Sequence, residues 1–182
     1  QETKKLEGTL KVVTTGDAYQ PLFDKFTEEV GPKVEFISMS SGEVLSKLKA
    51  EGGTPAADLW FGGGIDAFMD AKDNNLLEKV DFDAADELAP EFKDSDNYWF
   101  SKGVTVVGFI VNNDILKEKG LEAPKSWDDL TKEEYQGEVL MSNPAISGTN
   151  YAVVNALLQT KGEEEGWKYF EELNKNIEYY SK

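Results

Sequence analysis

The sequence of 182 residues contains no cysteine and no histidine. Without cysteine the chain forms no disulfide, offers no thiolate to a metal and has no cysteine nucleophile. Without histidine it has no Ser-His-Asp triad and no zinc site of the usual kind. These absences exclude several common catalytic sites. The avoidance of cysteine also suits an oxidising compartment.

Long hydrophobic runs and basic residues are also scarce. No apolar run approaches the roughly 20 residues that a membrane-spanning helix needs. There are 19 Lys and Arg against 35 Asp and Glu, which gives a net charge of −16. Because so acidic a chain repels a phosphate backbone, we expect no nucleic-acid partner. Hydrophobic residues make up 40% of the chain, which is enough for one domain or two small ones.

The first residues, QETKKLEG, are polar and lack an initiator Met. This pattern is typical of a mature end left after removal of a signal peptide, and a cloning boundary has the same appearance. We therefore expect a periplasmic or extracellular protein. Lipid anchoring before processing is an alternative that the sequence leaves open.

Segments of β type and helical type alternate through the first 80 residues. The expected elements are strands within 6–16, 33–42 and 55–64, and helices within 20–31, 42–53 and 65–80. Strands that alternate with helices of about 10–15 residues indicate βαβ units and a parallel sheet. The predicted fold class is therefore α/β.

The second half of the chain continues with a mixed pattern. Residues 81–98 are polar and loop-like, and 103–113 form the longest β-type run of the sequence. The remaining expected elements are a turn with a short helix in 124–137, a strand in 138–144, and helices within 141–159 and 163–176.

Small polar residues and glycine gather at four junctions between expected strands and helices. These junctions are Thr14–Asp17, Ser40–Gly42, Gly62–Gly64 and Ser147–Asn150. Ligands of open parallel sheets collect beyond the carboxyl ends of the strands, and helix N-termini offer free N–H groups to anions. The same residues are ordinary caps and turn formers. Four such junctions in one chain nevertheless favour a binding cleft.

Two long stretches resemble the periplasmic solute-binding proteins of ABC importers. They begin SSGEVLSKLKAEGG, covering 40–80, and YWFSKGVTVVGFIVNN, covering 98–177. The most similar branch is the ferric-iron-binding type of extracellular solute-binding family 1, which also includes phosphonate, phosphosugar and thiamine binders. The resemblance implies a type II periplasmic-binding-protein fold. Lobe one would occupy 1–105 and lack its C-terminal return, while 106–182 would supply a crossover strand and a partial second α/β lobe.

The resemblance also implies which residues contact the ligand. These residues are Thr15, Gly16, Asp17, Ser40, Ser41, Gly63, Gly64 and Ile65 in lobe one, and Ser147, Gly148 and Thr149 in lobe two. The Ser-Gly-Thr sequence would hold the anionic part of the ligand, or a synergistic anion beside iron. Tyr179 and Tyr180 are similar to the paired tyrosines of ferric-binding members, and ferric iron prefers phenolate and carboxylate oxygens. Adjacent strand residues point to opposite faces, so both reach one metal only if the backbone leaves strand geometry.

The expected function is that of an extracytoplasmic solute-binding component that works with an ABC permease. Ferric iron with a bound anion is the first ligand, and an organophosphate, phosphonate or thiamine-type solute is the alternative. We expect no resident cofactor and no enzymatic activity, because the S-x-x-K at Ser46 and S-D-N at Ser95 lack a K-T-G partner. Family members run to roughly 300 residues, so the chain reads as truncated. A strand- or lobe-swapped dimer, or assembly with a second chain, is therefore the other class of function.

Overall fold

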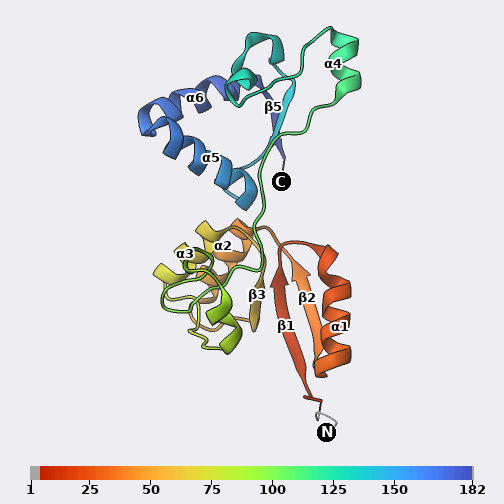
Figure 1. Ribbon diagram of the computed structural model, residues 1–182, viewed down its shortest axis with the longest axis vertical. Coiled ribbons are helices and arrows are strands. Elements are labelled where there is room, and N and C mark those ends of the chain that lie inside the picture. Colours follow the sequence, from red (N-terminus) through yellow and green to blue (C-terminus); the bar gives the residue numbers. More distant parts are fainter. Residues whose placement is uncertain (1–4, 182) are drawn as a thin grey trace. The chain divides into compact units, whose positions relative to one another are not determined.

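The computed structural model describes residues 5–181 and divides into two units (Figure 1). The first unit extends to Val104, and the second begins at Thr105. The sequence predicts the division one residue later, between residues 105 and 106. Both units contain parallel strands followed by helices, as the predicted α/β class requires. Within the described residues, every helix is too short or too polar to cross a membrane.

A sheet of three parallel strands organises unit 1, in the order β2-β1-β3. Its strands are β1 (Thr9–Thr14), β2 (Lys33–Ser38) and β3 (Leu59–Phe61), and each is followed by a helix, namely α1 (Gln20–Val30), α2 (Ser41–Glu51) and α3 (Ile65–Asp73). Because all three strands run the same way, their carboxyl ends meet at one edge of the sheet. The predicted βαβ units of the first 80 residues are confirmed.

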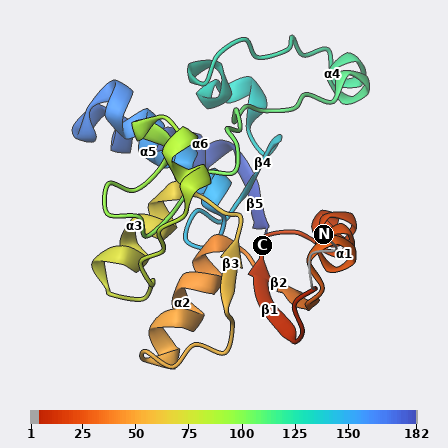
Figure 2. The same cartoon turned by 60° about the horizontal axis from the view of Figure 1, so that its bottom comes forward.

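Side chains alternate between the two faces of this sheet and pack against different helices. On one face, the ring of Phe23 from α1 lies 5.1 Å from that of Phe36 and 5.7 Å from that of Phe61. On the other face, Val13 packs with Val44 and Leu48 of α2. Figures 1 and 2 show α1 on one side of the sheet and α2 with α3 on the other. Burial of both faces holds the βα junctions at the carboxyl edge in place.

Unit 2 is built on a pair of parallel strands and two packed helices. Its elements are α4 (Asn113–Lys119), β4 (Val139–Ser142), α5 (Gly148–Lys161), α6 (Glu163–Asn176) and β5 (Ile177–Ser181). The buried core consists of Leu130, Val153, Leu157, Tyr169 and Leu173. The Asn176 side chain donates to the carbonyls of Leu130 and Lys132, at 2.8 and 2.7 Å, which ties the end of α6 to the preceding loop.

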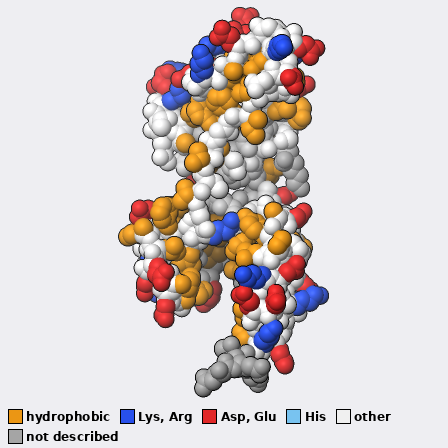
Figure 3. Space-filling model, turned by 45° about the vertical axis from the view of Figure 1, so that its right-hand side comes forward, with side chains coloured by type: hydrophobic (Ala, Val, Ile, Leu, Met, Phe, Trp, Pro, Cys, Tyr) orange, Lys and Arg blue, Asp and Glu red, His pale blue; other side chains and the backbone are white. Residues whose placement is uncertain are grey.

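The predicted strand at 103–113 is wrong, because residues 103–112 form no strand. Side chains of this segment still alternate between partly buried and exposed positions. Val107 and Phe109 pack against the core of unit 2, whereas Val106 and Ile110 are 98% and 100% exposed. A strand needs a neighbour for its hydrogen-bond ladder, and the described chain places none beside this segment. Hydrophobic side chains accordingly remain on the surface of both units (Figure 3).

One helix prediction is too long, and one helix of the structure was not predicted. The helix expected over 65–80 ends at Asp73, and Asn75 adopts a positive φ of 56° just after it. Helix α4 had not been predicted. It begins because the side chain of Asn112 accepts hydrogen bonds from the backbone N–H groups of Asp114 and Ile115, at 3.1 and 3.2 Å.

Candidate functional site

The three βα junctions of unit 1 converge at the carboxyl edge of the sheet. A Cβ atom on Gly62 would lie 2.7 Å from Thr15 Oγ1, and one on Gly63 would lie 2.8 Å from Ser41 Oγ and 3.4 Å from Thr15 Cγ2. Both glycines adopt positive φ, 91° and 127°. Glycine is needed here for its backbone conformation and for the space that its missing side chain leaves.

The two serines of the second junction have different roles. Ser40 is held in a capping box: its hydroxyl and its backbone N–H both donate to the Glu43 carboxylate, each at 2.9 Å. Ser41 is buried, and its Oγ accepts the N–H of Gly64 at 3.2 Å. Ser41 therefore links the second junction to the third, whereas Ser40 mainly starts helix α2.

The other predicted residues of unit 1 lie at the same edge and are more open. Gly16 has extended backbone, with φ of −176°. The exposed Asp17 follows it, and its carboxylate forms no hydrogen bond or ion pair within residues 5–181. Ile65, at the start of α3, is 47% exposed. The hydroxyl of Thr15 has no hydrogen-bond partner in the described part of the chain, so it is free to meet a solute.

Two residues that sequence reasoning missed complete this edge. Lys102 Nζ donates to the Tyr19 hydroxyl at 2.7 Å, and its Cε would lie 3.4 Å from a Cβ on Gly62. The two residues are 83 positions apart. No local pattern signals such a pairing, because only the fold brings the polar segment around Lys102 back to the first βα junction.

In unit 2 the predicted Ser-Gly-Thr sequence forms the N-terminus of α5. The Ser147 side chain is the cap, and its Oγ accepts from the backbone N–H and the side-chain amide of Asn150, at 3.3 and 3.0 Å. The N–H groups of Gly148 and Thr149 donate to no group among the described residues. The first turn carries no acidic side chain, whereas that of α6 carries three. This end of α5 is therefore both capped and open to an anion.

The tyrosine pair of β5 keeps ordinary strand geometry. Tyr179 pairs with Leu140 and Tyr180 with Met141, so successive side chains point to opposite faces. The Tyr180 hydroxyl donates to Asn174 Oδ1 at 2.7 Å, and partial burial raises the pKa of this phenol, which disfavours a phenolate. Nowhere in the described residues do three or more His, Cys, Asp or Glu form a metal-binding group.

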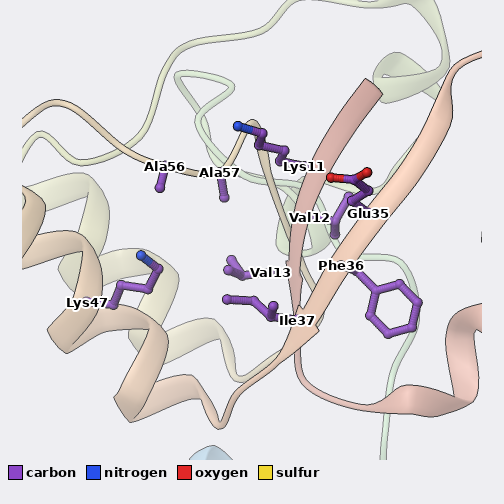
Figure 4. Close-up of a pocket in the computed structure, with 9 residues that line it drawn as sticks. All are labelled: Lys11, Val12, Val13, Glu35, Phe36, Ile37, Lys47, Ala56 and Ala57. Carbon is purple, nitrogen blue, oxygen red and sulfur yellow. The ribbon is translucent and has the colours of Figure 1, made fainter. Parts of the chain in front are cut away.

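A separate cavity of about 220 Å³ lies on the α2 face of the sheet in unit 1. Figure 4 shows its lining residues, which are Lys11, Val12, Val13, Glu35, Phe36, Ile37, Lys47, Ala56 and Ala57. None of these residues belongs to the predicted site. The cavity is lined mainly by strand side chains of β1 and β2, away from the carboxyl edge where the junctions meet.

Comparison with known proteins gives three informative matches besides a family model. The model, described as bacterial extracellular solute-binding protein, matches residues 55–181. An uncharacterised protein of Haemophilus influenzae is 34% identical over 162 residues, which are 86% of this chain and 47% of that protein. The Fe(3+)-binding periplasmic protein of Serratia marcescens is 27% identical over 158 residues, 86% of this chain and 45% of that one.

The third match is a solved structure. The periplasmic binding protein AfuA from Actinobacillus pleuropneumoniae, with exogenous fructose-6-phosphate bound, is similar at a TM-score of 0.90 and 31% identity. The match covers 96% of this chain and 57% of that chain. The chain thus spans about half the length of the curated relatives that it matches.

Proposed function

The chain belongs to the bacterial extracellular solute-binding protein family, and we propose that it acts as the extracytoplasmic solute-binding component of an ABC importer for an organic phosphate. The predicted family and the predicted type II periplasmic-binding-protein fold are confirmed by the family model and by the likeness to AfuA. Proteins of this family bind solutes and do not transform them, in agreement with the expectation of a non-enzyme.

The observation that carries the proposal is the open N-terminus of α5. Two backbone N–H groups, those of Gly148 and Thr149, have no protein acceptor within residues 5–181. They stand at the positive end of a helix of 14 residues. A phosphate group offers several anionic oxygens to such donors, and helix N-termini are common phosphate sites for this reason.

The overall charge of the protein makes local donors necessary. At a net charge of −16 the chain repels an anion at long range, so affinity must come from groups in direct contact with it. Backbone N–H groups serve this purpose because they carry no counter-ion and stay in place. The relative with fructose-6-phosphate bound, at 31% identity, supports a phosphate ester as the class of solute.

Ferric iron, the first ligand expected from the sequence, has less support in the geometry. Tyr179 and Tyr180 lie on opposite faces of β5, and the hydroxyl of Tyr180 is already bonded to Asn174. The Fe(3+)-binding relative is 27% identical. Iron with a bound anion is therefore the competing outcome of the experiment below.

The proposed partner is the membrane permease of the importer, and the proposed compartment is the periplasm. In this arrangement the protein captures its solute outside the cytoplasmic membrane and delivers it unchanged. This assignment is inferred from the family and from the periplasmic location of the Fe(3+)-binding relative.

A thermal-denaturation panel tests the proposal. Fructose 6-phosphate, fructose and Fe(III) citrate would each be added to the protein. A solute present at about 100 times its Kd stabilises a folded protein by roughly 2.7 kcal/mol, which for a chain of this size raises Tm by about 5–10 °C. We expect this rise with fructose 6-phosphate and none with fructose. A rise with Fe(III) citrate alone, accompanied by a visible phenolate-to-iron absorption band, would replace the organic phosphate with iron.

A further inference from the structure

Lys102 is held against two aromatic rings at the carboxyl edge of unit 1. Its Nζ lies 2.7 Å from the Tyr19 hydroxyl and 4.5 Å from the centroid of the Tyr19 ring. The centroid of the Phe61 ring is 5.4 Å away. Aromatic rings attract an ammonium group without neutralising it, so these contacts fix the position of the charge and leave it available.

No carboxylate within residues 5–181 lies within 4.0 Å of Lys102 Nζ. Lys72 of the same unit, for comparison, pairs with both Asp94 and Asp96, at 2.7 and 2.8 Å. An ammonium group has three donors, and Lys102 uses one of them on Tyr19. Two donors and the full charge therefore remain for an external acceptor.

Lys102 and Thr15 both pack closely against Gly62. A Cβ on this glycine would lie 3.4 Å from Lys102 Cε and only 2.7 Å from Thr15 Oγ1, so no larger residue fits between them. The Thr15 hydroxyl has no protein partner in the described chain. A charged donor and a neutral donor thus lie beside the same glycine.

The basic residues of the chain narrow the choice of anion-binding group. All 19 are lysine, and arginine is absent from the sequence. Within this chain, no residue can make the bidentate guanidinium contact that often binds phosphate, so any cationic contact that this chain makes comes from lysine. Lys102 meets this requirement at an edge where other predicted ligand residues converge.

We propose that Lys102 is a specificity-determining residue of the solute site, donating with the Thr15 hydroxyl to an anionic oxygen of the solute. The inference rests on the proposed function, because it names the group in unit 1 that selects an anion over a neutral sugar. Tyr19 acts on the solute only through Lys102, as a positioning residue. Sequence reasoning assigned no role to either residue.

Calorimetric titration with fructose 6-phosphate tests the role of Lys102. In Lys102→Met the aliphatic length is kept and the charge is lost, and we expect affinity to fall about 10- to 30-fold, as for loss of one charged hydrogen bond. Lys102→Arg keeps the charge and should recover most of the affinity. The unliganded Tm of both variants should match that of the unmodified protein, because the side chain is exposed.

Lys33→Met is the matched control, because it removes the same charge from the opposite end of the same sheet. Lys33 begins β2, roughly 16 Å from the carboxyl end of that strand at about 3.3 Å per residue. Its exposed ion pair with Glu35 contributes little to stability. We expect its affinity to stay within about twofold of that of the unmodified protein.

The outcomes separate this inference from the proposed function. If Lys102→Met binds fructose 6-phosphate as tightly as the unmodified protein, the role of Lys102 is overturned and the proposed function stands. An equal loss in Lys33→Met would also overturn it, because the effect would then belong to net charge. If the unmodified protein binds no fructose 6-phosphate, the proposed function fails and the inference with it.

Discussion

Replacement of Gly148 by proline is expected to weaken binding of fructose 6-phosphate by about 10- to 100-fold while the protein stays folded. Gly148 is the first residue of α5, where proline is well tolerated because no intrahelical bond uses that N–H. The preceding residue, Ser147, already has the extended backbone that a following proline requires, with φ of −87° and ψ of 111°. The substitution therefore removes one hydrogen-bond donor from the anion site and changes little else. Loss of one charge-assisted hydrogen bond should weaken the binding free energy by about 1.5–3 kcal/mol.

Gly148→Ala provides the control for this experiment, because it changes the residue and keeps the N–H group. Its affinity, measured by the same calorimetric titration, should stay within about threefold of that of the unmodified protein. Tm of both variants would be measured without solute. Full affinity in a folded Gly148→Pro protein would show that the N-terminus of α5 does not bind the phosphate.

The second large effect is expected at Gly62, where alanine should abolish most solute binding. At φ of 91° any L-residue is strained, by about 1–2 kcal/mol. In addition, the new Cβ would press on Thr15 Oγ1 from 2.7 Å and lie 3.4 Å from Lys102 Cε. The hydroxyl must move away, which changes its position relative to the Lys102 ammonium group. We expect affinity for fructose 6-phosphate to fall at least about tenfold.

Gly53→Ala is the control that separates the effect of backbone strain from the effect of the new side chain on Thr15 and Lys102. Gly53 has nearly the same φ, 89°, and nothing lies within 4 Å of a Cβ at that position. Both variants should lose stability in denaturant unfolding, Gly62→Ala somewhat more because of its contact with Thr15, and only Gly62→Ala should lose affinity. Equal affinities in the two variants would mean that the arrangement of Thr15 and Lys102 beside Gly62 takes no part in binding.

Local features of the fold could be predicted from the sequence. The three βα units of the first 80 residues follow from apolar periodicity and from glycines that end helices, such as Gly31 after α1. The segment 103–113 has equally strong β character, yet 103–112 form no strand. Strand formation depends on a neighbour that lies elsewhere in the chain, and local pattern does not report whether that neighbour is present.

In the candidate site too, contacts between residues adjacent in sequence could be predicted, and contacts between distant residues could not. Ser147–Thr149 were predicted correctly as a helix start, because a cap and its helix are adjacent in sequence. The contact between Lys102 and Tyr19 spans 83 residues and was missed. The role of Tyr179 and Tyr180 in metal binding stays a prediction, as does a swapped dimer.

Titration of fructose 6-phosphate with the protein, followed by ³¹P NMR, tests the central claim most directly, because it observes the phosphate group itself. We predict that the phosphorus resonance shifts or broadens as protein is added and that the change is lost with Gly148→Pro. A resonance that stays unchanged in the presence of excess protein would contradict recognition of an organic phosphate.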